Sequence, residues 1–410
     1  MDLTRTLRRG ALAPLATAAL LLAGLGAAAP AAATTGHENP LDARHVQFYV
    51  EPDTNAADQA ATWAAEGRTA DAAAMRSLAK ISQAIWFTKG TPAEVRGQVH
   101  EVVTAAARAH QVPVLAAYYI PGRDCSQYSA GGAPSEQAYR QWISAFAKGI
   151  GGRRAVVILE PDGLALLSSE AWCGEGGGGS TGLPEDFSLV DERFREVNYA
   201  ITTLRRQPRT AVYIDSGHSA WQQINDYDAG FGVPNQQLGM ASRLLKGGIA
   251  KADGFFLNVS NYRSDAELAE YGTNLSKCLA FRMRTGATTC TDADIAAVPN
   301  DARRLTHFVV DTSRNGQGPW TPPAGVYTDA QDWCNPPGRG LGIRPTTDTG
   351  NPLIDARLWV KRPGESDGSC TRGTAGPEDP EYGIVDPAAG VWWADYALGL
   401  AQRANPPLAR

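Results

Sequence analysis

The chain is poor in the features that mark nucleic-acid-binding and metal-dependent proteins. Its 410 residues carry 38 Lys and Arg against 43 Asp and Glu, a formal net charge of −5. It therefore has no excess positive charge to hold a phosphate backbone. It has only six His, no His-Glu-x-x-His and no Cys-x-x-Cys pair, which argues against a zinc site built by the protein. We expect no nucleic-acid partner, no metal and no cofactor.

The sequence has one long apolar run, and that run lies at its start. Arg5, Arg8 and Arg9 precede apolar residues from Ala11 to about Ala29, and small residues follow at Ala31–Ala33. This pattern predicts a secretory signal peptide over residues 1–33. The mature protein would be secreted, extracellular and outside the membrane, and we expect a monomer.

The sequence also lacks a Ser/Thr/Pro-rich linker and an internal repeat. With 43% hydrophobic residues it is too apolar for disorder, and we expect one domain over residues 34–410. Six cysteines remain in it, an even number that indicates three disulfides in a secreted protein, although six cysteines allow 15 pairings. They are Cys125, Cys173, Cys278, Cys290, Cys334 and Cys370.

Seven or eight short apolar runs read as strands buried on both faces. They are Val46–Val50, Ala84–Phe87, Val112–Tyr119, Ala155–Leu159, Ala211–Ile214, Phe255–Leu257, His307–Val310 and Arg357–Val360. Helical patterns separate most of them, beginning at the cap Thr91-Pro92-Ala93-Glu94 and near Ser135. Further helices are predicted at Leu189–Arg206, Asn235–Leu245, Asp265–Leu279 and Ala388–Ala404. This alternation predicts a parallel β/α barrel (TIM-like), with a doubly wound sheet as the alternative.

Polar residues follow nearly every predicted strand. In a parallel barrel the strand ends meet on one face, the face that carries active sites. The carboxylates expected there are Asp124, Glu160, Asp162, Asp215, Asp311, Glu365 and Asp367. Crowded carboxylates raise one another's pKa, so one of them can stay protonated beside ionised partners. Glycosidic bond cleavage has this requirement, and Trp86, Trp221 and Trp333 could stack on sugars.

Simpler interpretations exist for single residues. Asp162 follows a proline and could cap a helix. Glu160 and Asp311 could be structural ion-pair partners, and His218 a structural histidine. Trp142, Trp359, Trp392 and Trp393 look like core residues. Gly178-Gly179-Ser180-Thr181-Gly182 matches a serine-nucleophile motif but lacks its strand–turn–helix setting.

Taken together, these segments make the chain resemble a catalytic domain of glycoside hydrolase family 6, the inverting β-1,4-glucanases and cellobiohydrolases. The resemblance covers about Asn39 to Leu408. The segments that carry it are Tyr118–Cys125, Val157–Asp162, Tyr213–Trp221, Asn258–Tyr262, Asp311–Gly316, Asp332–Pro336 and Trp359–Gly368. It implies a distorted seven-stranded parallel β/α barrel with its active site at the C-terminal ends of the strands, and β-1,4-glucan as substrate.

The resemblance also implies roles for single residues. Asp162 corresponds to the general acid, and Asp124 to the Asp that raises the pKa of the acid and organises water. Asp215 corresponds to an Asp that supports the acid electrostatically, and Asp367 to the candidate base, which acts directly or through a water relay. The candidate substrate-binding residues are Tyr118, Trp86, Trp221, Trp333, Asn258, Lys361, Glu365 and His218.

For the cysteines, the resemblance implies the pairs Cys125–Cys173 and Cys334–Cys370, which leaves Cys278 and Cys290 for each other. One position departs from the family. Many members have a serine six residues after the Asp that corresponds to Asp124, where it holds the water chain. Here that residue is Ala130, next to Ser129, so the water relay is the part of the mechanism that transfers least directly.

The loops favour an endo-acting enzyme. The segment from Asp311 to Trp333 is short and that from Gly368 to Val391 is intermediate, whereas cellobiohydrolases of this family close the cleft with two long loops. We therefore expect an open cleft and internal cleavage of cellulose or a related β-glucan. The alternatives are a cellobiohydrolase that releases cellobiose from chain ends and an inactive glucan-binding protein.

Overall fold

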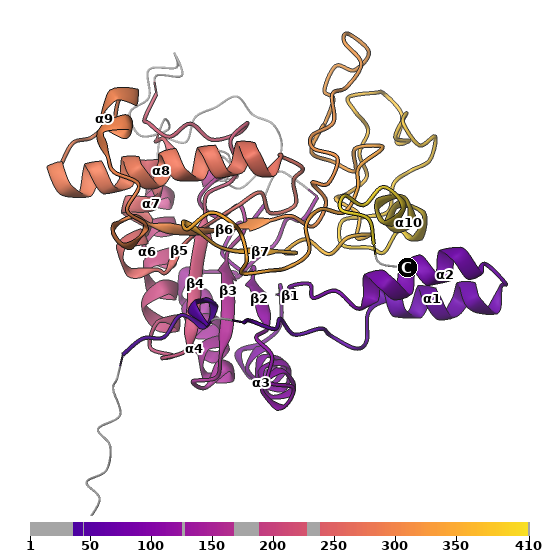
Figure 1. Cartoon of the computed structure of the whole chain (residues 1–410), viewed down its shortest axis with the longest axis horizontal. Coiled ribbons are helices and arrows are strands. Elements are labelled where there is room, and N and C mark those ends of the chain that lie inside the picture. The colour runs from indigo at the N-terminus through magenta and orange to yellow at the C-terminus, as the bar shows by residue number, and fades with distance from the viewer. Residues whose placement is uncertain (1–35, 44, 125–127, 168–187, 228–237, 409–410) are drawn as a thin grey trace, which may run out of the picture. The chain divides into compact units, whose positions relative to one another are not determined.

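Seven parallel strands form one curved sheet whose strand order follows the chain from β1 to β7. They are β1 (Ile85–Phe87), β2 (Val114–Ala117), β3 (Ala155–Leu159), β4 (Thr210–Asp215), β5 (Gly254–Leu257), β6 (His307–Asp311) and β7 (Ile354–Leu358). Figure 1 shows β6 and β7 crossing the direction of β2–β4 as the sheet curls. The predicted distorted seven-stranded parallel barrel is confirmed. The two edge strands, β1 and β7, are not paired in the described sheet. Next to them, the Ala84 N–H donates to the Trp359 carbonyl at 2.8 Å.

The structure is a computed structural model that describes residues 36–43, 45–124, 128–167, 188–227 and 238–408. The predicted signal peptide and the cysteines Cys125 and Cys173 lie outside these ranges. Gly36–Arg410 form one compact unit. Of the predicted strands, Val46–Val50 forms only an isolated bridge, between Phe48 and Val112.

Among the described α-helices, two precede β1, one follows β7 and the others lie between strands in the chain. They are α1 (Asn55–Ala65), α2 (Thr69–Ala79), α3 (Pro92–Arg108), α4 (Glu136–Ile150), α6 (Ser188–Leu204), α7 (Met240–Gly247), α8 (Asp265–Thr285), α9 (Asp292–Ala297) and α10 (Ala394–Gln402). Those at residues 55–65, 69–79 and 292–297 were not predicted from the sequence. Thr91 and Glu94 form the predicted capping box of α3, and Ser135 caps α4. None of the helices in the described part of the chain is long and apolar enough to cross a membrane.

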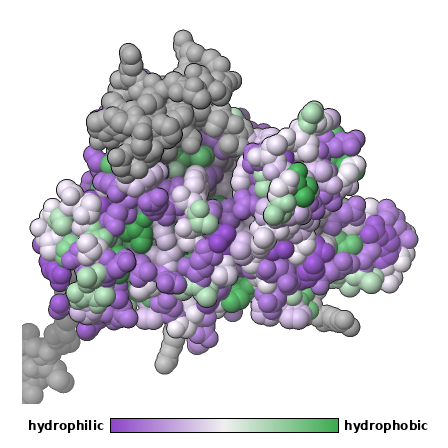
Figure 2. All heavy atoms as spheres, turned by 90° about the horizontal axis from the view of Figure 1, so that it is seen from above, coloured by the Kyte–Doolittle hydropathy of each residue, from purple (hydrophilic) through white to green (hydrophobic). Residues whose placement is uncertain are grey.

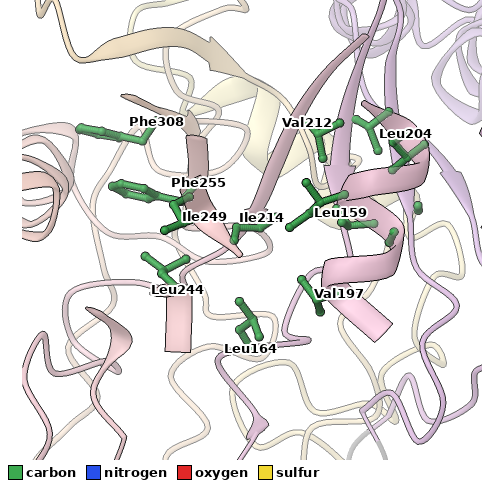
Figure 3. Close-up of a cluster of buried hydrophobic side chains, with 14 of the residues drawn as sticks. Leu159, Leu164, Val197, Leu204, Val212, Ile214, Leu244, Ile249, Phe255 and Phe308 are labelled. Carbon is green, nitrogen blue, oxygen red and sulfur yellow. The ribbon is translucent and has the colours of Figure 1, made fainter. Parts of the chain in front are cut away.

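Strands β2–β5 are buried on both faces along their whole length, which explains their continuous apolar runs, whereas β7 alternates buried and half-buried residues. Alternate residues such as Leu159, Ile214 and Phe255 pack against the surrounding helices, whereas Ile158 and Phe256 fill the inside of the curl. Figure 3 shows the helix-facing cluster, in which Leu164 lies with Val197 of α6 and Leu244 of α7. Leu164 belongs to the loop after β3, so this loop is anchored in the core.

A third cluster joins the two ends of the described chain. Helices α1, α2 and α10 pack together around Trp63, Met75 and Trp393. Of the tryptophans expected in the core, Trp142, Trp359 and Trp393 are buried, and Trp392 is half-buried. The face shown in Figure 2 is largely hydrophilic, with its apolar residues in small separate patches.

Candidate active site

A cleft of about 800 Å³ opens where the loops after the strands meet. It gathers eleven of the twelve side chains predicted for catalysis or substrate binding. They are Asp124, Asp162, Asp215, Asp367, Tyr118, Trp86, Trp221, Trp333, Lys361, Glu365 and His218. Residues that sequence reasoning did not single out also line it, among them Arg123, Tyr128 and Arg263.

Asp124 follows β2, in what we call the Asp124 loop (residues 118–124). It has a left-handed φ of 48° and its side chain is buried. Its Oδ2 accepts the Ser129 backbone N–H at 2.6 Å. Burial raises the pKa of Asp124 to about 6, although the Ser129 N–H and Arg123 act in the opposite direction. The cleft therefore contains one carboxyl group that changes charge near pH 6.

Asp162 lies in the loop after β3, here called the acid turn (residues 160–167). Glu160 and Asp162 have left-handed φ values of 52° and 66°, a conformation that is costly for non-glycine residues and persists only where the surroundings enforce it. The Asp162 side chain is half-buried and faces the cleft.

Asp215, at the end of β4, holds the acid turn by its backbone. Its Oδ2 accepts the N–H groups of Leu164 at 3.1 Å and Ala165 at 2.7 Å, and the Asp162 N–H also binds this carboxylate. Burial raises the pKa of Asp215, and these N–H groups only partly oppose the shift. The acid turn is thus fixed directly to the next strand.

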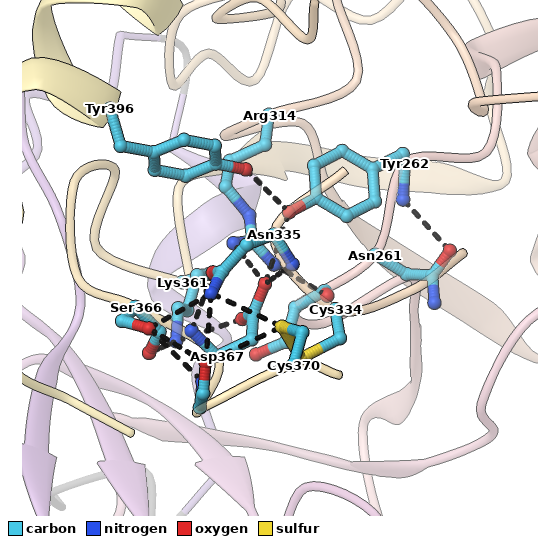
Figure 4. A network of polar contacts seen from close by, with 12 residues as sticks. Asn261, Tyr262, Arg314, Cys334, Asn335, Lys361, Ser366, Asp367, Cys370 and Tyr396 are labelled. Atoms are coloured by element: carbon cyan, nitrogen blue, oxygen red, sulfur yellow. Dashed lines mark hydrogen bonds and ion pairs between the residues drawn. A yellow bond between two sulfur atoms is a disulfide. The ribbon is translucent and has the colours of Figure 1, made fainter. Parts of the chain in front are cut away.

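Asp124, Asp162 and Asp215, at or after the ends of β2–β4, form what we call one side of the cleft, and Asp367, which follows β7, belongs to the other. Asp367 lies in a cluster of cations and donors (Figure 4). Its Oδ2 accepts Arg314 Nη1 at 2.8 Å, the Tyr262 hydroxyl at 3.1 Å and the Asn335 N–H at 3.0 Å. Its Oδ1 lies 3.1 Å from Lys361 Nζ. Burial alone would raise the pKa of Asp367, but Arg314 and Lys361 outweigh it and lower the pKa to about 2. Asp367 is therefore a permanent carboxylate.

Three tryptophans lie along the cleft. Trp86 packs edge-on against Tyr118, with ring centroids 5.4 Å apart, and its Nε1 donates to the Val360 carbonyl at 2.8 Å. Trp221 is 40% exposed, and Trp333 contacts Tyr128 at 6.1 Å between centroids. Such rings offer flat apolar faces to a ligand.

The remaining polar groups of the cleft suit hydrogen bonding. Burial and, to a smaller extent, Arg263 lower the pKa of His218 to about 4, although Glu267 acts in the opposite direction, so this imidazole is neutral at neutral pH. Burial raises the pKa of Glu365, which lies 3.6 Å from Arg362.

Asn258 is the predicted site residue that the structure keeps out of the cleft. It is fully buried; its Nδ2 donates to the Asp311 carbonyl at 2.8 Å and its Oδ1 accepts the Arg263 N–H at 3.0 Å. Asp311 is buried too and accepts the N–H groups of Ser313 and Lys361. Both shape the loops behind the cleft wall.

Two disulfides are present in the described part of the chain, Cys278–Cys290 and Cys334–Cys370, as expected. The second joins the residue after Trp333 to the loop that carries Asp367. Among the described residues, one group of side chains is close enough to share a metal ion, Cys370, Asp379 and Asp386. Cys370 is in the disulfide and Asp379 pairs with Arg372 at 2.6 Å, so this group does not suit a cation.

Arg314 is a further member of the site that sequence reasoning missed, although it lies within the quoted segment Asp311–Gly316. It is fully buried, stacks on Tyr262 at 4.4 Å and also donates to the Ser260 carbonyl at 2.6 Å. A buried arginine needs a carboxylate partner, and the strand-end position next to Asp311 was the available signal.

Comparison with known proteins identifies the family of the chain. A family model described as glycosyl hydrolases family 6 matches residues 43–404. Endoglucanase A of Thermobispora bispora is 36% identical over 96% of this chain and 70% of its own length, and Endoglucanase 1 of Streptomyces halstedii is 37% identical over 82% and 86%. The structure of the endoglucanase Cel6 from Mycobacterium tuberculosis, in complex with methyl-cellobiosyl-4-deoxy-4-thio-β-D-cellobioside, matches with a TM-score of 0.65 and 36% identity, over 89% of this chain and 99% of that one. The chain belongs to family 6 of the glycosyl hydrolases.

Proposed function

We propose that this glycoside hydrolase is an exported endo-β-1,4-glucanase that cleaves internal bonds of cellulose or a related β-glucan with inversion of the anomeric carbon. The observation that carries the proposal is the contrast across the cleft. Asp124 and Asp215 have raised pKa values on one side, and Asp367 is held ionised on the other. The relatives named endoglucanase support the substrate class.

In the proposed mechanism Asp162 is the general acid. It gives its proton to the glycosidic oxygen as the bond from this oxygen to the anomeric carbon breaks. A water molecule attacks that carbon from the opposite face and loses a proton to solvent, and Asp162 then takes up a proton again. The neighbouring carboxylates Asp124 and Asp215 favour the protonated form of Asp162 by their charge.

Asp367 serves this reaction as a fixed hydrogen-bond acceptor, because Arg314 and Lys361 compensate its charge. A carboxylate with a pKa of about 2 is a weak base, so it accepts a proton poorly from the attacking water. The proton of that water is therefore proposed to leave through further water molecules. Ala130 has no hydroxyl group to hold these water molecules. The Ser129 carbonyl, which accepts Arg123 Nε at 3.2 Å, has a second lone pair that could accept a hydrogen bond from one of them instead.

The aromatic residues and the polar groups of the cleft would bind the glucan. Trp86, Trp221 and Trp333 are proposed to stack on glucosyl rings, with Tyr118 next to the sugar at the cleavage point. Lys361, Glu365 and neutral His218 are proposed to bond sugar hydroxyls. Removing such a group weakens binding without removing the acid.

The variant Asp162→Ala tests the acid assignment. Loss of a general acid costs about 10²- to 10⁴-fold in rate, so turnover of cellopentaose should nearly disappear while its binding, measured by calorimetry, persists. Asp395→Asn, at an exposed position on α10, is the control and should behave as wild type. Unchanged turnover by Asp162→Ala would refute the assignment.

Product analysis separates the proposed activity from its alternatives. An endo-acting enzyme lowers the viscosity of carboxymethylcellulose faster than it releases reducing ends, and inversion gives the α-anomer first by NMR. Cellobiose as the sole product from crystalline cellulose would instead indicate a cellobiohydrolase. Binding without any cleavage would indicate an inactive glucan-binding protein.

A further inference from the structure

The acid turn and the Asp124 loop come from neighbouring strands, and both hold a site aspartate in left-handed backbone. Asp124 has φ 48° and Asp162 has φ 66°. Each conformation is strained, so contacts outside the two loops must fix where the two carboxyl groups lie.

Arg193 of α6 reaches both loops from behind the cleft. Its Nη1 donates to the carbonyl of Gly163, next to Asp162, at 2.9 Å. Its Nη2 donates to the carbonyl of Pro121, three residues before Asp124, at 2.7 Å. The guanidinium is buried at 6% exposure, so water competes little for these bonds.

Two glutamates accompany this arginine. Glu196, one turn further along α6, lies 3.5 Å from Arg193 Nε, and burial raises the pKa of this glutamate to about 8 although Arg193 acts in the opposite direction. Glu160, in the acid turn, accepts the N–H groups of Tyr119 and Ile120 at 2.8 and 2.9 Å. The two loops are therefore joined twice, by a carboxylate on N–H groups and by a guanidinium on carbonyls.

A second buried arginine holds the other end of the acid turn. Arg243 Nη1 of α7 donates to the carbonyls of Leu164 at 2.9 Å and Ala165 at 2.7 Å, whose N–H groups bind Asp215. Arg243 does not replace Arg193, because its contacts lie beyond Asp162 and none of its described bonds is to the Asp124 loop.

We propose that Arg193 is a positioning residue for the acid: by bridging the Gly163 and Pro121 carbonyls it sets the placement of Asp162 against Asp124. This inference rests on the proposed role of Asp162. A planar guanidinium presents two donors in a fixed fork, which a lysine ammonium cannot reproduce across two separate carbonyls. The variant Arg193→Lys therefore keeps the charge and loses the bridge.

The test compares two substrates that differ in their need for an acid. Cellopentaose has a poor leaving group, a sugar hydroxyl, and needs the proton of Asp162. In 2,4-dinitrophenyl cellotrioside the leaving group is dinitrophenolate, which departs without being protonated. We expect Arg193→Lys to lower kcat on cellopentaose by about 10- to 100-fold and kcat on the dinitrophenyl substrate by less than about threefold, with KM little changed for both.

Arg282→Lys is the matched control. Arg282 is also a buried arginine, on α8, and it donates to the Ser242 hydroxyl at 3.0 Å and the Ala287 carbonyl at 3.3 Å, outside the cleft. A structural loss alone should lower both activities of this variant equally. Equal losses on the two substrates by Arg193→Lys, or no loss, would overturn the inference.

Two further variants keep the outcomes separate. If Arg193→Lys does not fold, the double variant Arg193→Met/Glu196→Met replaces the buried ion pair by apolar side chains, a change that proteins often tolerate, and should give the same selective loss. Asp162→Ala is measured in parallel. If Asp162→Ala does not lose more activity on cellopentaose than on the dinitrophenyl substrate, the proposed function fails. If Asp162→Ala shows this selective loss and the Arg193 variants do not, only the inference about Arg193 fails.

Discussion

The two sides of the cleft treat buried carboxylates in opposite ways. Asp124 and Asp215 are buried among backbone N–H groups, and burial raises the pKa of both. Asp367 is buried just as deeply, yet Arg314 and Lys361 lower its pKa to about 2. Burial favours the neutral form of a carboxyl group, and neutral N–H donors correct this only in part, whereas adjacent cations reverse it. One fold thus maintains a proton-holding side and a permanently charged side.

The largest effect should come from removing the cation that maintains this difference. Arg314→Met leaves Asp367 buried with Lys361 as its remaining described cation, and breaking a buried pair costs about 3–5 kcal/mol of stability. Because the lowered pKa of Asp367 contributes stability above the unfolded value of about 3.9, the loss should be full at pH 7 and fade as pH falls toward 2. Urea unfolding at pH 7 measures it.

The double variant Arg314→Met/Asp367→Asn serves as the control for that experiment. If the loss arises from an uncompensated carboxylate, removing the charge should recover most of the stability. A loss below about 1 kcal/mol in Arg314→Met would contradict the comparison between the two sides.

A smaller effect is expected on the proton-holding side. Asp124 ionises near pH 6, and its carboxylate form supports the protonated Asp162, so kcat/KM of the wild type should rise with pH through 6. Asp124→Asn removes this rise and lowers kcat/KM at pH 7 by about 10- to 100-fold, or about 1.4–2.7 kcal/mol. The amide oxygen can still accept the Ser129 N–H. An inflection that stays near pH 6 in the variant would show that another group causes it.

The smallest effect, on stability, should come from Asp386. This carboxyl group lies near Asp367, yet its pKa is raised like those of Asp124 and Asp215. Asp386 accepts Asn335 Nδ2 at 2.9 Å, and burial together with Asp379 raises its pKa to about 7. The folded protein holds this proton, so stability falls from about pH 4 to pH 7 as the unfolded chain prefers to release it. Asp386→Asn should therefore gain about 1 kcal/mol at pH 8 and nothing at pH 4, measured by Tm. A gain of equal size at both values would show that titration is not the cause.

Much of the fold and the site could be predicted from sequence because both depend on local patterns. Continuous apolar runs identified the strands, and the segments around Asp124, Asp162 and Asp367 indicated the cleft. The run Val46–Val50 failed as a strand because an apolar segment also needs a partner with free ladder positions, and only Phe48 finds one. The strand predicted at Arg357–Val360 begins earlier, at Ile354, since Asp355 and Arg357 alternate with buried residues.

What the sequence could not supply is the set of long-range contacts. Arg193 is 30 residues from Gly163 and 72 from Pro121 in the chain, and no motif links them. Its place at both carbonyls depends on how α6 packs on the sheet. Arg314 likewise meets Asp367 across 53 residues. Helices α1 and α2 were missed because they are rich in Ala and carry few apolar anchors, such as Trp63 and Met75.

The strand order, which follows the chain from β1 to β7, has a consequence for how such an enzyme diversifies. Each strand delivers its own loop to the rim in turn, and the scaffold beneath does not depend on the length of any of them. Mutation or engineering can therefore lengthen one rim segment, such as that between Asp311 and Trp333, while the acid turn stays in register. A change from internal to terminal cleavage of a polymer would then require only insertions in separate loops. Each insertion can be tested by grafting one longer loop at a time.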